Sequence, residues 1–352
     1  MRLVTIEPEA AGEAAGAAYR PAVVLASGRL LTLGALAQMA PSYLSNEIGR
    51  MDLAAMLAHD VGLGAVRDAL EISDDGALEA AALDPATVRL AAPIPRPGKV
   101  VGVGYNYLDH IREQGLERPA RPVLFSMFAN AVAADGAPIR HPAGTHALDL
   151  EAELAVVIGR PASRLTPSQA ALCVAGYTAA NDVTARDWQG QVRALLPGEK
   201  GDGQWLRAKG SDTFLPLGPV MVTADELGDG GGLAVRSWRT AASGPDAGVL
   251  FKMQDGNTSD LLFSVADLVA IISAEVSLEP GDVIVTGTPS GVGVNREPPV
   301  FLEPGDLVRV EIERIGSLTN PITDAEGRAP AGSPAAQFMA ERAAQYEAGG
   351  RP

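Results

Sequence analysis

The chain of 352 residues has only one cysteine, few histidines and few aromatic side chains. A single cysteine, Cys173, excludes an internal disulfide framework and favours a reducing compartment. Its apolar neighbours indicate that it fills the core and is not a nucleophile. No apolar run approaches the roughly 20 residues that span a membrane, and residues 1–25 lack the pattern of a signal peptide. We therefore expect a cytoplasmic protein.

Basic residues are scarce as well. The chain has 28 Lys and Arg against 43 Asp and Glu, which gives a net charge of −15. Nucleic acids and anionic membranes attract basic patches, so neither is expected as a partner. The hydrophobic fraction of 47% and the charged fraction of 20% are typical of a globular protein. The length allows one large domain beside a small one.

Composition along the chain predicts three segments. Residues 1–92 mix short strands with helical patterns and are expected to form a small α+β domain. Alternating prolines in residues 93–98 cannot continue a helix, so we place the boundary there. Residues 93–325 contain more strands than helices without regular alternation, which predicts an α+β, mainly β catalytic domain with a helix over 260–272. Residues 326–352 form a C-terminal tail rich in Ala, Gly and Pro.

Three carboxylates stand where a protein has little structural reason for them. Glu151 and Glu153 open an apolar, β-branched run that ends at Gly159, which is typical of a strand. Residues two apart on a strand share a face, so these charges repel unless a cation lies between them. Asp182 follows another apolar segment and could add a third oxygen. Such an all-oxygen site favours Mg²⁺, Mn²⁺ or Ca²⁺ over Zn²⁺. The alternative is a solvated strand edge.

His110 and Glu113 are three residues apart on a predicted helix over 107–114, so their side chains can meet on one face. A carboxylate beside an imidazole orients the ring and makes it more basic, which suits a base that activates water. The alternative is an ordinary pair on a helix surface. For Lys209 the ordinary alternative is a solvated lysine.

Five sequence blocks follow one another along the chain. They are G-x-N-Y-x-x-H-x-x-E at 104–113, D-x-E-x-E-L-A-V-V-I-G at 149–159, N-D-V-T-A-R-D-x-Q at 181–189, K-G-x-D-T-F-x-P-x-G-P at 209–219 and G-D-V-I-V-T-G-T-P-S-G-V-G at 281–293. With these blocks the chain resembles the fumarylacetoacetate hydrolase superfamily, from about residue 98 to 321. Within the superfamily it is similar to acylpyruvate hydrolases and hydroxyheptadienedioate isomerases. The resemblance implies a mixed β-roll catalytic domain, a divalent metal ion and a homodimer.

The resemblance also implies a role for each candidate residue. Glu151, Glu153 and Asp182 would hold Mg²⁺ or Mn²⁺, while His110 and Glu113 would form the dyad that activates water. The remaining expected residues are Lys209 and Gln189, as donors to an oxyanion, and Thr288, Tyr105 and Arg186, as substrate contacts. Arg186 could instead brace its loop by pairing with Asp187.

The implied reaction is the hydrolysis of a carbon–carbon bond in a β-diketone acid of the acylpyruvate or fumarylpyruvate type. It would pass through an enolate that the metal stabilises. In this superfamily the same site also supports oxaloacetate decarboxylation and hydroxydienoate isomerisation or lyase steps, and these stay open. One departure concerns Phe125-Ser126-Met127-Phe128, where many relatives carry a lysine. The missing cation puts binding of a second substrate carboxylate in question.

Overall fold

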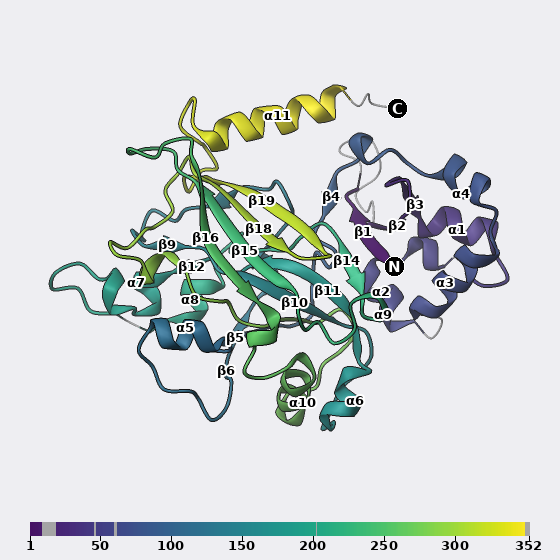
Figure 1. The fold of residues 1–352 in the computed structure, drawn as a ribbon. Helices are drawn as coiled ribbons and strands as arrows, with labels where there is room; N and C mark the ends of the chain where they lie inside the picture. The colour runs from purple at the N-terminus through teal and green to yellow at the C-terminus, as the bar shows by residue number, and fades with distance from the viewer. Residues whose placement is uncertain (9–18, 46, 60–61, 202, 349–352) are drawn as a thin grey trace.

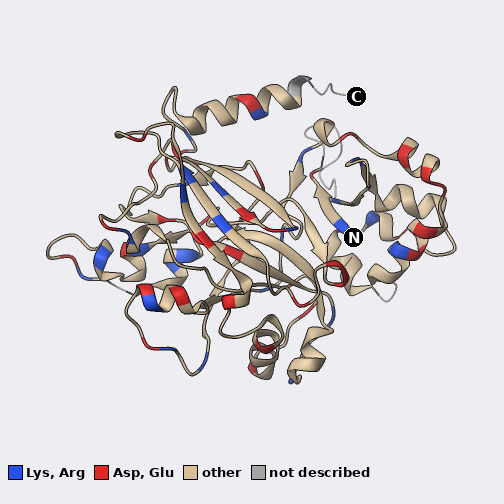
Figure 2. Cartoon of the chain, in the orientation of Figure 1, with Lys and Arg blue, Asp and Glu red and all other residues tan. Residues whose placement is uncertain are grey.

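The structure is a computed structural model that describes residues 1–8, 19–45, 47–59, 62–201 and 203–348. Two large β-sheets form its centre, and helices gather in groups around them (Figure 1). In these ranges no helix has the length and apolar character needed to cross a membrane. Basic and acidic residues are interspersed along the chain (Figure 2).

The larger sheet has ten strands and carries the candidate site. Its order is β3-β2-β1-β14-β11-β10-β17-β5-β6, and β4 also pairs with β1. The bounds are β1 (Arg2–Ile6), β2 (Arg20–Val24), β3 (Leu30–Thr32), β4 (Leu90–Ala91), β5 (Val100–Gly104), β6 (Val123–Met127), β10 (Ala152–Ile158), β11 (Val174–Asn181), β14 (Met221–Thr223) and β17 (Val283–Val285). Most neighbours are antiparallel, whereas β17 and β5 run parallel.

The second sheet has five strands in the order β16-β15-β18-β19-β8. They are β8 (Ile139–Arg140), β15 (Ala234–Thr240), β16 (Leu250–Asn257), β18 (Leu307–Ile312) and β19 (Gly316–Thr323). Two short pairs complete the strands of the described residues: β9 (Leu148–Asp149) with β12 (Thr184–Ala185), and β7 (Val132–Ala133) with β13 (Leu215–Pro216). Leu154 and Val156 of the larger sheet share one buried cluster with Val235 and Val310 of the smaller one. This apolar contact fixes the two sheets against each other.

The helices fall into groups that Figure 1 separates clearly. Four of them, α1 (Leu33–Met39), α2 (Leu53–Ala58), α3 (Gly62–Ile72) and α4 (Asp75–Ala81), lie beside β1–β3. Three lie near the candidate site: α5 (Leu108–Glu113), α7 (Arg186–Gln189) and α8 (Trp205–Lys209). The others are α6 (Pro167–Ala171), α9 (Ala224–Leu227), α10 (Val265–Glu275) and α11 (Pro334–Ala348). The predicted class, α+β with a sheet-rich catalytic part, is confirmed.

The N-terminal segment is joined to the rest through the large sheet. Leu3 of β1 pairs with Met221 of β14. Leu3 also shares a buried cluster with Ala155 and Val157 of β10. Strands on both sides of residue 92 therefore belong to one sheet, and the boundary expected there stays a prediction.

One expected helix begins later than its apolar pattern indicated. The pattern predicted a helix over 260–272, whereas α10 runs from Val265 to Glu275. Ser264 caps it: its hydroxyl accepts from the Asp267 backbone N–H at 3.2 Å, and the Asp267 carboxylate accepts from the Ser264 N–H at 3.1 Å. This capping box satisfies free N–H groups of the first turn, so the helix starts there despite apolar residues further upstream.

Candidate active site

The ends of β10 and β11 bring the three carboxylates together. The strands are antiparallel with Ala152 opposite Asn181, so Glu151 and Asp182 lie at adjoining ends. The Asp182 N–H donates to the Glu151 carbonyl at 2.9 Å. Glu151, Glu153 and Asp182 are 6%, 2% and 0% exposed, and their carboxylate oxygens approach within 4.8 Å of one another. The prediction that they form one cluster is confirmed, and the solvated-edge alternative is wrong.

Lys209, at the end of α8, reaches into this cluster. Its ammonium nitrogen lies 2.7 Å from Glu151 Oε2 and 2.6 Å from Asp182 Oδ2, and it donates to Thr184 Oγ1 at 2.8 Å. An ammonium group has three N–H donors, and all three are thus engaged within the protein. Lys209 is buried, so the solvated-lysine alternative is wrong. Its expected role as an oxyanion donor would require it to exchange one of these partners.

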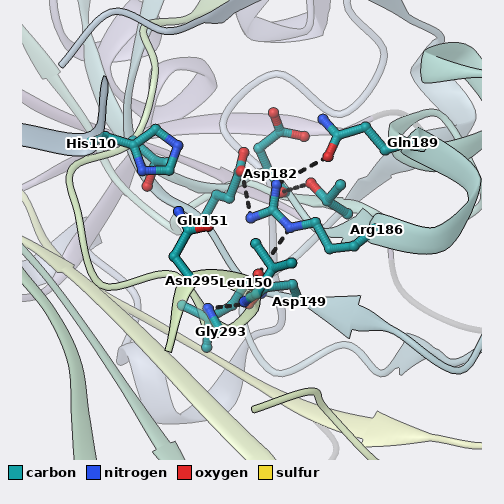
Figure 3. A network of polar contacts seen from close by, with 12 residues as sticks. His110, Asp149, Leu150, Glu151, Asp182, Arg186, Gln189, Gly293 and Asn295 are labelled. Carbon is teal, nitrogen blue, oxygen red and sulfur yellow. Dashed lines mark hydrogen bonds and ion pairs between the residues drawn. The ribbon is translucent and has the colours of Figure 1, made fainter. Parts of the chain in front are cut away.

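Arg186 supplies a second buried cation (Figure 3). Its Nη2 lies 2.7 Å from Glu151 Oε1, and its Nε lies 2.9 Å from Asp149 Oδ2. The expected pairing of Arg186 with Asp187 is therefore wrong. Asp187 instead accepts from the Thr145 hydroxyl at 2.5 Å. Arg186 lines the pocket, but its contacts indicate that it braces Glu151 from the start of α7.

The ionisation of the three carboxylates reflects their burial and the charged groups beside them. Burial opposes ionisation of Glu151, but Lys209 and Arg186 outweigh it and lower the pKa to about 2. Burial raises the pKa of Asp182 to about 7, while Lys209 opposes the rise and Glu151 adds to it. Burial, Asp182 and Glu151 raise the pKa of Glu153 well above its ordinary value. The protein alone thus holds one carboxylate firmly ionised and disfavours the charge on the other two.

These residues fit a divalent cation. Four buried carboxylates, those of Asp149, Glu151, Glu153 and Asp182, lie around the two cations Lys209 and Arg186, so an excess of two negative charges results when all four are ionised. Asp182 Oδ1 is buried and has no hydrogen-bond partner among the described residues. A bound divalent ion would offset both charges and give this oxygen a partner. Because all donors are oxygens, Mg²⁺ or Mn²⁺ fits their chemistry best, and Ca²⁺ is compatible.

The helix α5 places His110 on the same pocket and Glu113 beside the His110 ring. His110 Nδ1 lies 3.2 Å from Glu113 Oε2. Glu113 also accepts from Asn295 Nδ2 and from the Gly291 N–H, each at 3.0 Å. Although burial opposes it, hydrogen bonds from His110, Asn295 and Gly291 lower the pKa of Glu113. The sequence prediction that the two side chains meet is confirmed. His110 is buried, so this is not an ordinary surface pair.

A small cavity separates this dyad from the carboxylates. Its volume is about 30 Å³, which is room for one or two water molecules. Tyr105, Phe125 and Trp205 line it, and their rings form one wall: Trp205 is 6.4 Å from Tyr105 and 5.3 Å from Phe125 between centroids. A substrate would therefore need side chains around the cavity to move. Met127 lies two residues beyond Phe125, but it is buried in the core beside Val100 and does not line this cavity.

The other two expected residues also line the cavity. Gln189 Oε1 accepts from Arg186 Nη1 at 3.2 Å, which leaves its amide N–H groups for another acceptor (Figure 3). The Thr288 hydroxyl donates to the Ala152 carbonyl at 2.9 Å and accepts from Gln254 Nε2 at 2.6 Å. The Thr288 hydroxyl thus uses its hydrogen to bind β10, and a substrate could bind only through the remaining lone pair of its oxygen. The roles expected for both residues stay predictions.

Sequence reasoning missed several residues of this site. They are Asp149, Gln114, Trp205, Gln254 and Asn295. Asp149 stands inside the same block as the two glutamates, so its position at i−2 was a usable signal. Gln114 lies four residues after His110 on the predicted helix, and this spacing was a usable signal too. Trp205, Gln254 and Asn295 contact residues far away in the sequence, and no local spacing reveals such contacts.

Comparisons of the chain with known families and proteins agree with the geometry of the site. The profile described as fumarylacetoacetate (FAA) hydrolase C-terminal matches residues 99–323. The chain belongs to this family. It is 42% identical to oxaloacetate tautomerase fahd2, mitochondrial, of Xenopus laevis over 240 residues, which are 68% of this chain and 70% of that protein. The human oxaloacetate tautomerase FAHD2A, mitochondrial, is also 42% identical, over 67% of this chain and 69% of that protein.

Solved structures support the same assignment. Fumarylacetoacetate hydrolase from the psychrophile Exiguobacterium antarcticum superimposes with a TM-score of 0.69 at 31% identity, covering 92% of this chain and 99% of that one. A 2-hydroxyhepta-2,4-diene-1,7-dioate isomerase from Mycobacterium marinum gives 0.62 at 32% identity, covering 92% and 98%. The family is one of enzymes, and these names include a hydrolase, an isomerase and tautomerases. Membership therefore leaves several reactions open.

Proposed function

We propose that this enzyme catalyses a metal-dependent proton transfer at the carbon beside the carbonyl of a 2-oxo acid, as in keto–enol tautomerisation of oxaloacetate. One observation carries the proposal: the imidazole of His110 faces the same small cavity as the buried cluster of Glu151, Glu153 and Asp182. Enolisation needs one base and one electrophile: His110 would be the base, and a cation held by the three carboxylates would be the electrophile. Curated relatives named oxaloacetate tautomerase, 42% identical, support this choice of substrate.

Each residue would have a defined part. A divalent cation held by Glu151, Glu153 and Asp182 would supply Lewis-acid polarisation of the substrate carbonyl. His110 would take a proton from C3 of the substrate at Nε2 and return it to the carbonyl oxygen, so that no other reactant is consumed. Glu113 would hold the Nδ1–H and stabilise the imidazolium while the proton is on the ring.

Hydrolysis of an acylpyruvate is the second candidate, and the pairing of the buried His110 with Glu113 favours it. In this reaction His110 would take a proton from water, and the oxygen of that water would attack the distal carbonyl. The carbon–carbon bond would then break to give a carboxylic acid and the enol of a 2-oxo acid. The 31% identity to a fumarylacetoacetate hydrolase of known structure supports this alternative. Gln189 has amide N–H groups available for the oxyanion.

A product assay would separate these reactions. Purified protein would be incubated with oxaloacetate, acetylpyruvate or a fumarylpyruvate-like diacid, each with Mg²⁺ or with EDTA. We expect Mg²⁺ to accelerate loss of the enol absorbance of oxaloacetate with no loss of total oxaloacetate. Pyruvate and the partner acid from the diketo acids would establish the hydrolase instead. Carbon dioxide and pyruvate from oxaloacetate alone would point to decarboxylation. Equal rates in Mg²⁺ and EDTA would contradict a metal-dependent site.

The cytoplasmic location and the homodimer inferred from the sequence stay predictions. The two oxaloacetate tautomerases compared above carry the word mitochondrial in their names. Gel filtration with light scattering would measure the oligomeric state directly.

A further inference from the structure

Gln114 lies against the nitrogen of His110 that would move the proton. It is the first residue after α5 and lines the cavity. Its side-chain nitrogen lies 2.7 Å from His110 Nε2, while Nδ1 on the other side of the ring lies 3.2 Å from Glu113 Oε2. Both ring nitrogens of a buried histidine are therefore held, one by an amide and one by a carboxylate.

These contacts specify the protonation of the ring. The lowered pKa of Glu113 means that its carboxylate is ionised at neutral pH and can only accept a hydrogen bond. The hydrogen must then be on His110 Nδ1. A neutral ring with Nδ1–H has an acceptor at Nε2, which matches the amide N–H that Gln114 presents. In the tautomer that these contacts favour, the lone pair of Nε2 is covered by Gln114.

We propose that Gln114 is a positioning residue for His110 in both of its protonation states. An amide carries a donor and an acceptor, so it can donate to neutral Nε2 and, after rotation, accept from a protonated Nε2 through Oε1. The substrate displaces this amide to reach Nε2, and Gln114 then holds the ring again when the substrate leaves. The proposal rests on the proposed function in one respect only, namely that His110 is the base.

Few charged groups lie around His110, so the effect of changing its contact with Gln114 can be tested directly. On α5 they are Glu113 and Asp109, whose carboxylate accepts from the His110 backbone N–H at 2.7 Å. Across the cavity, the Glu151 carboxylate interacts electrostatically with His110. Glu151 is itself paired with Lys209 and Arg186. A glutamate at position 114 would add a carboxylate at the ring nitrogen that now has none.

The first test is nuclear magnetic resonance of the histidine ring nitrogens in the full chain. The chain has four histidines, so the signals can be assigned with single His→Gln variants. Wild type should show His110 as the neutral Nδ1–H tautomer at pH 7.5. Gln114→Glu should convert it to the doubly protonated ring, because a carboxylate can only accept. Gln191→Glu is the matched control: Gln191 lines the same cavity, no described contact joins it to His110, and its variant should leave the tautomer unchanged.

The second readout is the pH profile of kcat/KM. For Gln114→Glu the acidic limb should move to higher pH by one unit or more, which lowers kcat/KM about tenfold per unit at pH values on that limb, and alkaline pH should restore it. Gln114→Leu, which can neither donate nor accept, should lower kcat about tenfold without moving the limb. A wild-type His110 spectrum in Gln114→Glu would overturn the proposal. Absence of turnover on every 2-oxo acid would instead refute the proposed function and leave the spectral result standing.

Discussion

Replacing Asp182 with asparagine should stabilise the metal-free protein at alkaline pH while it removes metal binding. Burial, opposed by Lys209 and reinforced by Glu151, raises the pKa of Asp182 from an ordinary 3.8 to about 7. The folded protein therefore holds this proton more tightly than the unfolded chain does. Stability that the proton provides is present at low pH and is lost as pH rises from about 4 through 7.

The size of the effect follows from that change in pKa. Each pH unit corresponds to about 1.4 kcal/mol, so a rise from 3.8 to about 7 amounts to about 4 kcal/mol above pH 7. Asparagine resembles the protonated acid and still offers an oxygen to Lys209. Asp182→Asn should thus match wild type near pH 4 and exceed it by up to about 4 kcal/mol at pH 8. At roughly 2 °C per kcal/mol for a large domain, this is up to about 8 °C in Tm.

Thermal unfolding followed by circular dichroism, at pH 4.5, 6 and 8, would measure the difference. In EDTA the Tm of the variant should rise above that of wild type as pH increases. Mg²⁺ should raise the Tm of wild type alone, because a ligand that binds only the folded state stabilises it. Asp282→Asn is the control: Asp282 is buried but pairs with Lys99 at 2.8 Å outside the cluster. That variant should lose stability equally in EDTA and Mg²⁺.

Three outcomes would refute this reasoning. If Asp182→Asn were less stable than wild type in EDTA at pH 8, then Lys209 would stabilise the charged aspartate more than burial destabilises it. If Mg²⁺ raised the Tm of the variant as much as that of wild type, Asp182 would not be a metal ligand. A stability difference that stayed constant between pH 4.5 and 8 would likewise show that ionisation of Asp182 is not its cause.

Three further predictions concern the base, a close backbone contact and a helix cap. His110→Ala should abolish tautomerisation and hydrolysis in a product assay but spare decarboxylation, which needs no base; full tautomerase activity would remove His110 from that role. Gly293→Ala should lower Tm strongly, since its added Cβ would lie 1.9 Å from the Val300 carbonyl oxygen, whereas Gly64→Ala, with nothing within 4 Å, should raise stability by about 0.5–1 kcal/mol. Ser264→Ala should cost about 1 kcal/mol in urea unfolding by removing the cap of α10, and an unchanged midpoint would contradict that role.

The sequence could predict those parts of the site in which two residues stand at the spacing that brings side chains onto one face of a strand or a helix. Glu151 and Glu153 are two apart on a strand, and His110 and Glu113 are three apart on a helix, so each pair had to share a face. The structure confirms both pairs. The start of α10 could also have been predicted, because Ser264 begins a capping box. The sequence prediction placed the start earlier because it followed the apolar residues before Ser264.

Long-range contacts were outside the reach of such reasoning. Lys209 is 58 residues from Glu151, and Asn295 is 182 residues from Glu113, yet each pair is in hydrogen-bond contact. Their meeting depends on the register of whole sheets and on the loops between them, which no short window encodes. The wrong pairing of Arg186 with Asp187 has the same origin. The nearest opposite charge in sequence was chosen, whereas the fold presents Arg186 to residues from another strand.

The choice between tautomerase and hydrolase lies on the His110 side of the cavity. The carboxylate cluster would serve either proposed reaction, because both would begin by polarising a 2-oxo acid. Hydrolysis also needs a water molecule between His110 Nε2 and the substrate, and in this structure Gln114 covers that nitrogen inside a cavity of about 30 Å³. Tautomerisation needs no such water, since His110 returns the proton that it takes. Any substrate must displace Gln114 to reach Nε2, and proton transfer within the substrate then needs no room for a further water molecule. Gln114→Leu, which leaves Nε2 without its amide partner, is the change that would most favour entry of water.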